Sequence, residues 1–354
     1  MKIDTKILIC YNAPVTLFSV YNGKPVNEGN KDEDLSEKNF LKELGNIRKT
    51  LKKYFAHVET LAIDREVQKA FDGINSFAPD VIFNFVESVE GITTYEYCIA
   101  GLYELLDYCY TGCDPISLGN CLNKAGTKDI LRSFGIKTPG YQTLKPNSRF
   151  TKNDITLNFP IILKLIKEDA SIGISEYSVV NNYTELRKQF KFLSKTYKQE
   201  IILEEYIIGR ELNIAILGNR PLPLSEIKFD GLPSSLPKIV TYEGKWIENS
   251  VYYNHTKPVC PAALSEVTLR KVNKIAMDAF KALNCRDYAR IDIRLNNKGI
   301  PYVIEVNPNP DISTDSGFAR AAKADGIHYS GILCTLANYA LERKKKNDTQ
   351  VKAG

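Results

Sequence analysis

Tyr288-Ala-Arg-Ile-Asp-Ile-Arg294 and Tyr302-Val-Ile-Glu-Val-Asn307 are two β-strand patterns, and the turn sequence Asn296-Asn-Lys-Gly299 lies between them. Asn and Gly favour the tight turn of a β-hairpin, so the two stretches are predicted to pair as antiparallel strands. Side chains alternate between the two faces of a strand. On the first strand Arg290, Asp292 and Arg294 therefore share one face, and on the second Glu305 and Asn307 do. The apolar residues Ile291, Ile293 and Val303, with Val306 nearby, fill the other positions.

Three oxygen-bearing side chains on this strand pair, Asp292, Glu305 and Asn307, suit a hard cation. Magnesium takes one or two protein carboxylates and completes its shell with phosphate oxygens and water. The pattern therefore fits a metal–nucleotide site. Periodicity favours equally a surface face on which Arg290 and Arg294 form salt bridges with the two carboxylates.

A second stretch, Lys164-Leu-Ile-Lys-Glu-Asp-Ala-Ser-Ile-Gly-Ile174, places a lysine near the end of a predicted strand and small residues in the loop that follows. Ser171 and Gly173 would let backbone N–H groups approach a phosphate. The spacing of a Walker A motif is absent. An ordinary hairpin loop is the alternative interpretation.

A third stretch, Ile201-Ile-Leu-Glu-Glu-Tyr-Ile-Ile-Gly-Arg-Glu211, runs from an apolar strand through carboxylates and a Gly turn into another strand. A hinge between two domains has this pattern, and so does an ordinary strand connection.

The first ~115 residues alternate strand and helix patterns, which predicts a parallel sheet with crossover helices. The strands are Lys6–Cys10, Val58–Ile63 and Val81–Phe85, and the helices are Glu33–Leu51 and Thr94–Leu106.

Ligands collect at the carboxyl ends of the strands in such sheets. Asn84, Glu87 and Glu90 follow the third strand and are candidates for touching substrate. Solvation of an ordinary loop explains each of them equally well.

The turn at Gly112–Asp114–Pro115 marks a predicted boundary, and the helix Lys124–Phe134 follows it. A small α+β unit comes next, with predicted strands Tyr141–Leu144, Pro160–Lys164, Ser178–Asn181 and Ile201–Tyr206 and helix Thr184–Lys195. The last part is strand-rich. Its elements are predicted at Glu211–Leu217, Leu222–Phe229, helix Leu264–Leu283, the strand pair described above and a terminal helix Ile327–Leu341.

Composition narrows the class of protein. The 354 residues are 44% hydrophobic and 25% charged, with a net charge of +5, which is ordinary for a globular protein. The stretch after Leu341 carries much of the net charge, so no basic patch for nucleic acid is indicated. We expect residues 343–354 to be a basic, solvated tail. No signal peptide or membrane span is predicted. The eight cysteines lack a Cys-x-x-Cys pair, which predicts reduced thiols and a cytoplasmic protein without a zinc site.

Taken together and in order along the chain, these segments resemble the D-alanine–D-alanine ligase branch of the ATP-grasp superfamily, from about Asn84 to Ser316. The landmarks are Tyr110-Thr-Gly-Cys-Asp114, Asn123-Lys124 with Thr127-Lys128, Lys164 through Ile174, Glu204 to Glu211, Cys260-Pro-Ala262, Arg290-Ile-Asp292 and Glu305-Val-Asn307.

The resemblance implies a three-domain fold of mixed α/β and α+β class. We expect an N-terminal parallel α/β domain at residues 1–117, a central α+β subdomain at 118–205 and a C-terminal antiparallel-sheet α+β subdomain at 206–342, before the tail. ATP would lie between the two antiparallel sheets.

The resemblance also implies roles for single residues. Lys124 and Lys164 would contact the nucleotide phosphates, with Glu168, Ser171 and Gly173 in a closing loop over them. Lys164, Ser171 and Gly173, with Arg290 at the reacting carboxylate, would form the catalytic set. The remaining predictions are Glu204, Glu205 and Ile207 at adenine, Glu211 at ribose, Asp292, Glu305 and Asn307 as ligands of two magnesium ions (which manganese can replace), and Lys245 and Ser316 at the carboxylate of the second substrate.

Departures from the family concern the substrates. The glutamate that binds the first substrate's ammonium is missing after the first strand, where Tyr11-Asn-Ala-Pro-Val15 stands. Glu87 and Glu90 lie in a segment that differs from the family pattern, and Asp311 replaces a glycine. These three are predicted to contact substrate.

We therefore expect an ATP-dependent carboxylate–amine ligase that forms an amide or peptide through an acyl phosphate and releases ADP and phosphate. An amino acid is the predicted nucleophile, and the product is expected to differ from D-alanyl-D-alanine. An authentic D-alanine–D-alanine ligase and an ATP-binding scaffold without turnover are the alternatives. The expected partners are small molecules, without nucleic acid or membrane, and a homodimer is left open.

Overall fold

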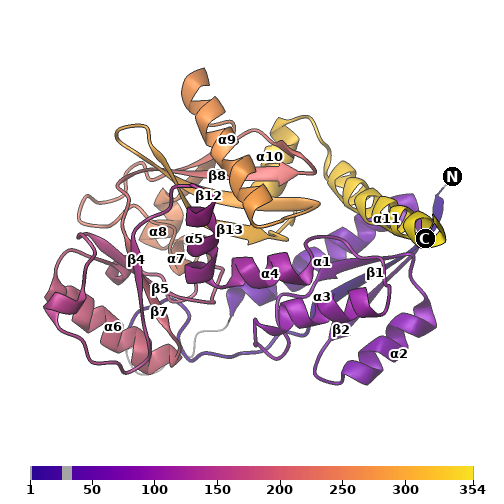
Figure 1. Cartoon of the computed structure of the whole chain (residues 1–354), viewed down its shortest axis with the longest axis horizontal. Helices are drawn as coiled ribbons and strands as arrows, with labels where there is room; N and C mark the ends of the chain where they lie inside the picture. Colours follow the sequence, from indigo (N-terminus) through magenta and orange to yellow (C-terminus); the bar gives the residue numbers. More distant parts are fainter. Residues whose placement is uncertain (1, 26–33, 354) are drawn as a thin grey trace.

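The computed structural model describes residues 2–25 and 34–353, with side chains described up to residue 346. Figure 1 shows three units: a parallel sheet with its helices at the right, a small sheet with one long helix at the lower left, and a larger sheet above and between them.

The N-terminal unit is a three-stranded parallel sheet in the order β2-β1-β3. It contains β1 (Ile3–Asn12), β2 (Phe55–Ile63) and β3 (Val81–Phe85), with helices α1 (Leu35–Tyr54), α2 (Val67–Phe77) and α3 (Tyr95–Leu105). The predicted strands and both predicted helices are confirmed, although Glu33, the predicted first residue of α1, lies outside the described residues. The sequence analysis missed α2.

Two consecutive helices, α4 (Pro115–Leu122) and α5 (Lys124–Ser133), lead out of this unit. Asp114 caps α4 by accepting a hydrogen bond from the Ser117 N–H, and Asn123 caps α5 in the same way. Such caps satisfy N–H groups that the helix leaves unpaired. The sequence analysis missed α4, whose proline at the first helical position was interpreted as a turn.

The central unit is a four-stranded antiparallel sheet in the order β4-β7-β5-β6. Helix α6 packs on this sheet. Apolar residues of the helix and the sheet form a separate buried cluster that includes Leu163, Phe190 and Leu203. The elements are β4 (Tyr141–Leu144), β5 (Ile161–Leu165), β6 (Val179–Val180), α6 (Tyr183–Tyr197) and β7 (Ile201–Glu205), with short 3-10 turns at Lys152–Asp154 and Glu176–Ser178.

The larger sheet has the order β11-β10-β8-β12-β13, and β9 pairs with β8. Its strands are β8 (Gly209–Leu217), β9 (Arg220–Pro221), β10 (Ser225–Lys228), β11 (Lys257–Val259), β12 (Tyr288–Asn296) and β13 (Pro301–Pro308). Helix α9 (Glu266–Ala282) covers one face, and the short helices α7 (Tyr242–Trp246) and α8 (Val251–His255) lie between β10 and β11 in the chain. The predicted antiparallel pairing of β12 with β13 is confirmed.

Strand β13 contains an irregularity that strict alternation could not predict. Asp292 pairs with Glu305 and Ile293 pairs with Val303, so Ile304 is an extra residue in β13. Val303 and Val306 are both buried although they are three residues apart. A β-bulge changes the phase of a strand in this way, and it allows Glu305 and Asn307 to face the same side as Asp292.

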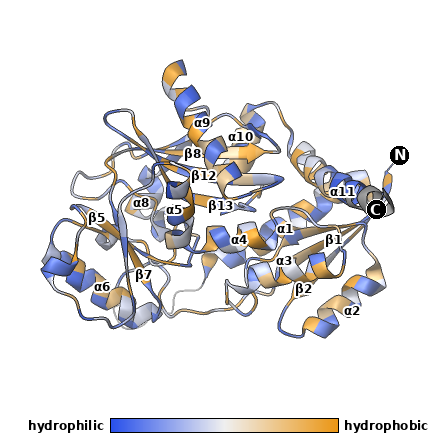
Figure 2. Cartoon of the chain, in the orientation of Figure 1, coloured by the Kyte–Doolittle hydropathy of each residue, from blue (hydrophilic) through white to orange (hydrophobic). Residues whose placement is uncertain are grey.

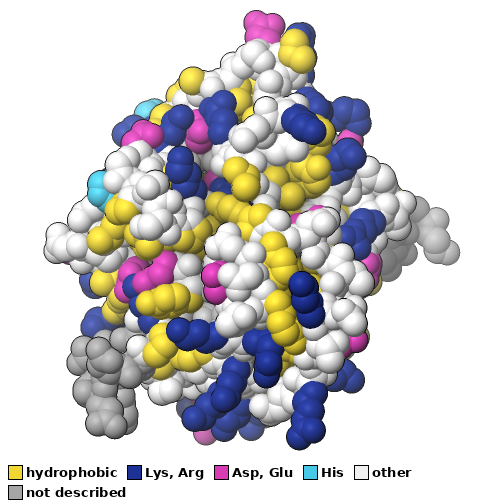
Figure 3. All heavy atoms as spheres, turned by 90° about the vertical axis from the view of Figure 1, so that its left-hand side faces the viewer, with side chains coloured by type: hydrophobic (Ala, Val, Ile, Leu, Met, Phe, Trp, Pro, Cys, Tyr) yellow, Lys and Arg dark blue, Asp and Glu magenta, His cyan; other side chains and the backbone are white. Residues whose placement is uncertain are grey.

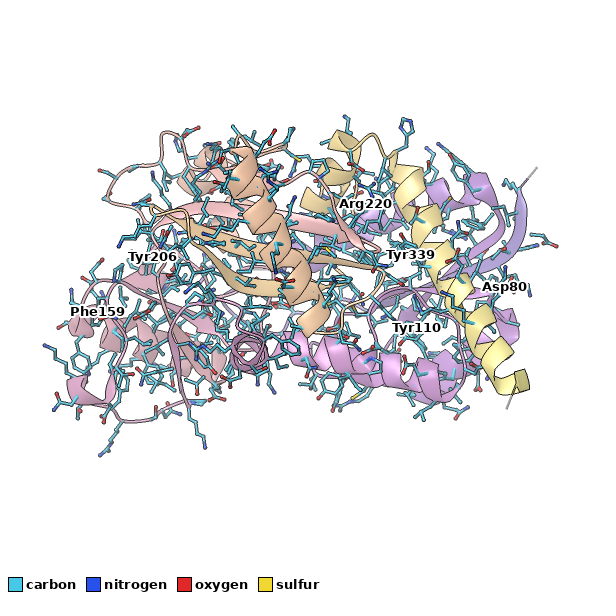
Figure 4. The ribbon with its side chains drawn as sticks, turned by 45° about the horizontal axis from the view of Figure 1, so that its top comes forward. Asp80, Tyr110, Phe159, Tyr206, Arg220 and Tyr339 are labelled. Atoms are coloured by element: carbon cyan, nitrogen blue, oxygen red, sulfur yellow. The ribbon has the colours of Figure 1, made fainter. Side chains whose placement is uncertain are left out.

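The chain closes with α10 (Gly317–Ala324) and α11 (Tyr329–Ala353), and α11 packs on the N-terminal unit. The backbone after residue 343 is helical, because α11 continues to Ala353. The expectation that this basic stretch is solvated stays a prediction. Arg343 donates to Asp287 and, at 2.7 Å, to the carbonyl oxygen of Tyr110. Figure 4 shows Tyr110 beside α11. The side chains of residues 347–354 lie outside the described part.

Apolar packing joins the first and third units. Leu8 and Ile82 of the N-terminal unit belong to the same buried cluster as Ile214 and Ile291 of the larger sheet. Figure 2 shows the apolar colour on the strands, whereas helices such as α2 and α6 carry both colours. In the chain as far as the structure describes it, no helix is long and apolar enough to cross a membrane.

Candidate active site

A cleft of about 940 Å³ lies between the central sheet, the larger sheet and the carboxyl end of β3. Its floor is formed by three rungs, by which we mean rows of residues side by side on neighbouring strands. The first rung is Ala215–Arg290–Asn307, the second is Ser225–Asn213–Asp292–Glu305, and the third is Ile227–Glu211–Arg294–Tyr302. The polar residues of the first two rungs, and Glu211 and Arg294 of the third, line the cleft.

Asp292 lies at the centre of the second rung and is held by three side chains. The Arg290 guanidinium donates to both of its oxygens, Nε to Oδ1 at 2.8 Å and a terminal nitrogen to Oδ2 at 2.9 Å. Asn213 Nδ2 donates to Oδ1 at 2.7 Å, and Asn307 Nδ2 donates to Oδ2 at 3.1 Å. The structure therefore brings all three predicted metal ligands and Arg290 together.

Asp292, Glu305 and Asn307 fit a magnesium site by the chemistry of their donors. Two carboxylates and an amide oxygen are hard ligands, and phosphate oxygens would complete the shell. Among the residues described, no group of three His, Cys, Asp or Glu side chains is placed to hold a metal. The set therefore suits a cation that arrives with a phosphate ligand better than one bound by protein alone.

Lys124 approaches the same rung from α5. Its Nζ lies 3.0 Å from Glu305 Oε1 and 2.8 Å from Asp169 Oδ1. Burial alone would lower the pKa of Lys124, but these two carboxylates raise it above its ordinary value. Burial would likewise raise the pKa of Glu305, yet Lys124, Lys164 and Arg290 hold it well below its usual range. Both groups are therefore charged at neutral pH.

Glu204 is fully buried between two lysines. Lys128 Nζ and Lys164 Nζ each lie 3.1 Å from one of its carboxylate oxygens. Lys128 also donates to the carbonyl oxygen of Ile304 at 2.8 Å. The sequence analysis gave Lys128 no role. A second lysine one helical turn after Lys124 lies on the same face of the helix, and this spacing could have indicated that both reach the same site.

The loop from Lys164 to Ile174 lies over this end of the cleft. Ala170, Ser171 and Gly173 have positive φ, and the Glu168 and Lys164 side chains line the cleft. Glu168 accepts a hydrogen bond from Gln199, and burial raises its pKa to about 7.

Outside contacts fix this loop. The Trp246 indole N–H donates to the carbonyl oxygen of Ala170 at 3.1 Å, and the Gly173 N–H donates to the carbonyl oxygen of Tyr21 at 2.8 Å.

Arg294 organises the end of the cleft near Ile207, Glu211 and Lys238. Its guanidinium donates to the carbonyl oxygens of Ile207 and Lys238, at 3.1 and 2.9 Å, and to Glu211 at 3.0 Å. It also lies 4.8 Å from the centre of the Tyr206 ring, which Figure 4 places where the central unit meets the larger sheet. The sequence analysis assigned Arg294 no function.

Glu205 departs partly from its prediction. It borders the cleft, but its carboxylate accepts hydrogen bonds from the Asn158 backbone N–H at 3.1 Å and side chain at 2.8 Å. Its side chain is therefore engaged with the edge of the central sheet.

Glu87, Lys245, Asp311 and Ser316 all line the cleft, and their contact with substrate stays a prediction. Glu90 does not line the cleft. Its carboxylate pairs with Arg65 at 3.2 Å, and it is absent from the cleft wall. The prediction for Glu90 is corrected: its positive φ places it in a turn that directs its side chain to the surface.

Glu37 contributes a carboxylate that the motifs did not reveal. It lies in the first turn of α1, lines the cleft, and accepts hydrogen bonds from the Val15 N–H at 2.7 Å and Asn12 at 3.2 Å. Burial raises its pKa to about 7. Burial within the cleft, together with Asp311 and other carboxylates, raises the pKa of Glu87 to about 8, although solvent still reaches this side chain. The part of the cleft around Glu37 and Glu87 therefore gathers carboxyl groups that keep their protons to a higher pH than an ordinary carboxylate does.

On the face seen in Figure 3, several Lys and Arg side chains lie along the lower part, and others are scattered among acidic and apolar side chains above them. The expectation that nucleic acid is not a partner stays a prediction.

Comparisons with known proteins agree on one family. A family model described as the D-ala D-ala ligase C-terminus matches residues 130–338, more than half of the chain. The D-alanine–D-alanine ligase of Carboxydothermus hydrogenoformans is 30% identical over 310 residues, which cover 85% of this chain and 92% of that protein. An uncharacterised protein of Sinorhizobium fredii is 30% identical over 264 residues, covering 74% and 75% of the two chains.

Solved structures agree on the fold. The D-alanine–D-alanine ligase from Bacillus anthracis complexed with ATP superposes with a TM-score of 0.72 at 23% identity, covering 97% of this chain and 99% of that one. The ligase from Coxiella burnetii gives a TM-score of 0.70 at 19% identity, covering 99% and 98%. The predicted ATP-grasp fold is confirmed.

Proposed function

Since the chain belongs to the D-alanine–D-alanine ligase family, we propose that it activates a carboxylate as an acyl phosphate and transfers the acyl group to the amine of an amino acid. It is an ATP-dependent ligase that forms ADP. The observation that carries the proposal is the approach of Lys124, on α5, to within 3.0 Å of Glu305 on β13 inside one cleft. Basic groups and acidic oxygen ligands thus converge where a triphosphate would lie.

The first step is attack of a carboxylate oxygen on the γ-phosphorus of ATP, with loss of ADP. Both reactants are anions, so the site must neutralise charge and hold them in line. Lys124 and Lys164 supply fixed positive charge at the phosphates. Magnesium bound at Asp292, Glu305 and Asn307 would neutralise the remaining phosphate charge.

The second step is attack of the amine on the acyl carbon. Arg290, in the first rung beside Asp292, would stabilise the oxyanion that forms at the acyl carbon. Phosphate then leaves, and the amine loses a proton as the amide forms. The loop around Ser171 and Gly173 would keep water away from the acyl phosphate.

The substrates are proposed to differ from two molecules of D-alanine. Asp311 places a carboxylate beside Glu87 at the acyl end, and the family's ammonium-binding glutamate is absent after β1. Lys245 and Ser316 line the cleft where a second amino acid's carboxylate would bind. The names of the relatives favour the second candidate, an authentic D-alanine–D-alanine ligase.

The two candidate functions can be separated by measuring ADP release from ATP with a panel of amino acids, supplied singly and in pairs. Turnover with pairs other than D-alanine is the expected result. Strong turnover with D-alanine alone would reject the proposed change of substrate and leave the ligase chemistry intact.

Glu305→Gln tests the chemistry itself. The substitution keeps the shape of the side chain but removes the charge that faces Lys124 and the cation, so ADP formation should fall at least about 100-fold. Glu266→Gln is the matched control, because Glu266 lies on α9 with its side chain 89% exposed, and it should keep full activity. An unchanged rate in Glu305→Gln would favour a binding scaffold or a different site.

A further inference from the structure

Asn213 was singled out by no motif, yet it touches one of the proposed cation ligands. It lies on β8 directly opposite Asp292 on β12, and Ser225 on β10 lies opposite it on the other side. Its Nδ2 donates to Asp292 Oδ1 at 2.7 Å, the shortest of the four hydrogen bonds to that carboxylate. Its side chain is half-buried and lines the cleft.

The Asp292 carboxylate is saturated with donors. Each oxygen of a carboxylate offers about two acceptor positions, and each oxygen of Asp292 accepts one bond from Arg290 and one from an amide. A cation can therefore bind only where a donor leaves. Arg290 is the donor with another proposed task, at the acyl group, and its long side chain can move without any change in the strands.

The two amides differ in what they can offer a cation. Asn307 carries an oxygen that can itself bind the metal, so its amide has a second use at the site. Asn213 meets Asp292 through its N–H group alone, from a strand locked in register on both sides. A fixed donor of this kind determines the plane of a carboxylate.

We propose that Asn213 is a positioning residue. Its amide stays hydrogen-bonded to Oδ1 of Asp292 and so fixes the carboxylate plane, which directs Oδ2 toward a divalent cation shared with Glu305. The inference rests on the proposed function, because it assumes that a cation binds at Asp292. It assigns Asn213 to metal affinity, and it leaves the phosphate contacts to the lysines.

Ser225 supplies a matched control from the same rung. It is 3% exposed, and its hydroxyl has no hydrogen-bond partner among the described residues. Ser225→Ala therefore removes a buried polar atom beside Asn213 without touching Asp292. Any general effect of altering this rung should appear in both variants, whereas loss of carboxylate orientation should appear in only one.

The test measures Mn²⁺ binding in the presence of ADP, by loss of the electron paramagnetic resonance signal of free Mn²⁺. We compare the wild type with Asn213→Leu, which keeps a similar volume without a donor, Asn213→Ala and Ser225→Ala. Both Asn213 variants should bind Mn²⁺ about 10-fold more weakly, the scale seen when a partner of a metal ligand is removed. Ser225→Ala should bind as the wild type does.

The outcomes separate the two levels of the proposal. If the wild type takes up no Mn²⁺ with ADP, the cation site of the proposed function and the role of Asn213 both fall. If the wild type binds Mn²⁺ and Asn213→Leu binds it equally tightly, only the role of Asn213 is overturned.

A crystal structure of the wild type with Mn²⁺ and ADP covers the case in which neither Asn213 variant folds. Asn213 Nδ2 within hydrogen-bond distance of Asp292 would support the inference, and an Asn213 side chain turned away from Asp292 would refute it.

Discussion

Arg294 is a buried cation that joins its own strand to two other stretches of chain at the proposed nucleotide end of the cleft. It is 3% exposed and holds the Ile207 carbonyl, the Lys238 carbonyl and the Glu211 carboxylate at once. A planar guanidinium can satisfy several acceptors in fixed directions, whereas an ammonium is a single point charge. The shape of the proposed adenine and ribose site therefore depends on this one side chain.

Arg294→Lys is expected to raise the KM for ATP about 10-fold, with a smaller change in kcat, because the substitution loses one or two buried hydrogen bonds near the base. Steady-state kinetics with varied ATP would measure both constants. Arg210→Lys is the control: Arg210 makes a comparable fork to Glu226 outside the cleft. Equal effects in the two variants would show that Arg294 acts on general stability.

Single residues were predictable where a local pattern marked them. The alternation of polar and apolar residues in β12 marked Asp292 as a candidate site residue. Lys124 was marked by its place in the Asn123-Lys124 motif. Partners distant in the chain were not predictable: Asn213 meets Asp292 across 79 positions and Arg294 meets Glu211 across 83. Glu37 was missed because only the residues directly after β1 were searched for a carboxylate, whereas Glu37 enters the cleft from the following helix.

At the level of elements, the segment of residues 13–25 joins the N-terminal unit to the loop over the cleft. The Gly23 carbonyl accepts from the Ser175 hydroxyl at 3.0 Å, and Phe18 packs edge-on against Tyr197 of α6. Lys24 forms ion pairs with Glu176 and Glu243, at 3.1 and 2.8 Å. We call residues 13–25 the strap. The strap precedes the central unit in the chain and contacts its loop and its helix α6.

Gly23→Ala tests the strap. Gly23 has φ +70°, and a Cβ there would lie 2.3 Å from the carbonyl oxygen of Gly173, so strap and loop must separate. We expect more ATP hydrolysed per amide formed, because water gains access to the acyl phosphate. The measurement is the ratio of phosphate released to amide formed.

Gly135→Ala is a close control, since Gly135 has φ +71° with nothing within 4 Å of the added Cβ. It carries the same backbone penalty, about 1 kcal/mol, without the collision. A ratio that rises equally in both variants, or in neither, would contradict the role of the strap.

Regular elements were predictable because their apolar residues repeat with the period of a strand or a helix. The predicted bounds of β3 and β4 match the structure, and those of α9 differ from it by one or two residues. The strap has no such repeat, and its partners in the central unit lie more than 100 residues away, so nothing in its local sequence predicted these contacts. The bulge at Ile304 could not be predicted either, because one extra residue in a strand leaves the sequence with an ordinary strand composition.

At the scale of the whole molecule, α11 ties the end of the chain to the beginning. Asp287, which is 6% exposed, accepts hydrogen bonds from Arg343 and from the Gly112 N–H. The first and third units therefore share two apolar clusters and are joined by the ion pair of half-buried Arg343 with buried Asp287, whereas the central unit keeps its own core.

A chain ending at Glu342 should be less stable than one ending at Lys346, by about 2 kcal/mol, because only the shorter chain removes the Arg343 donor from the buried Asp287 carboxylate. Thermal unfolding followed by circular dichroism would compare the two. Equal melting temperatures would support the solvated tail expected from the sequence.

The contact between Trp246 and Ala170 gives the protein a reporter of its own. The chain contains one tryptophan, and its indole N–H is bonded to the loop that covers the cleft. Emission from the unlabelled protein should therefore change whenever that bond breaks or forms. Rapid-mixing fluorescence could then time each movement of the loop during a single turnover, without any dye or added probe.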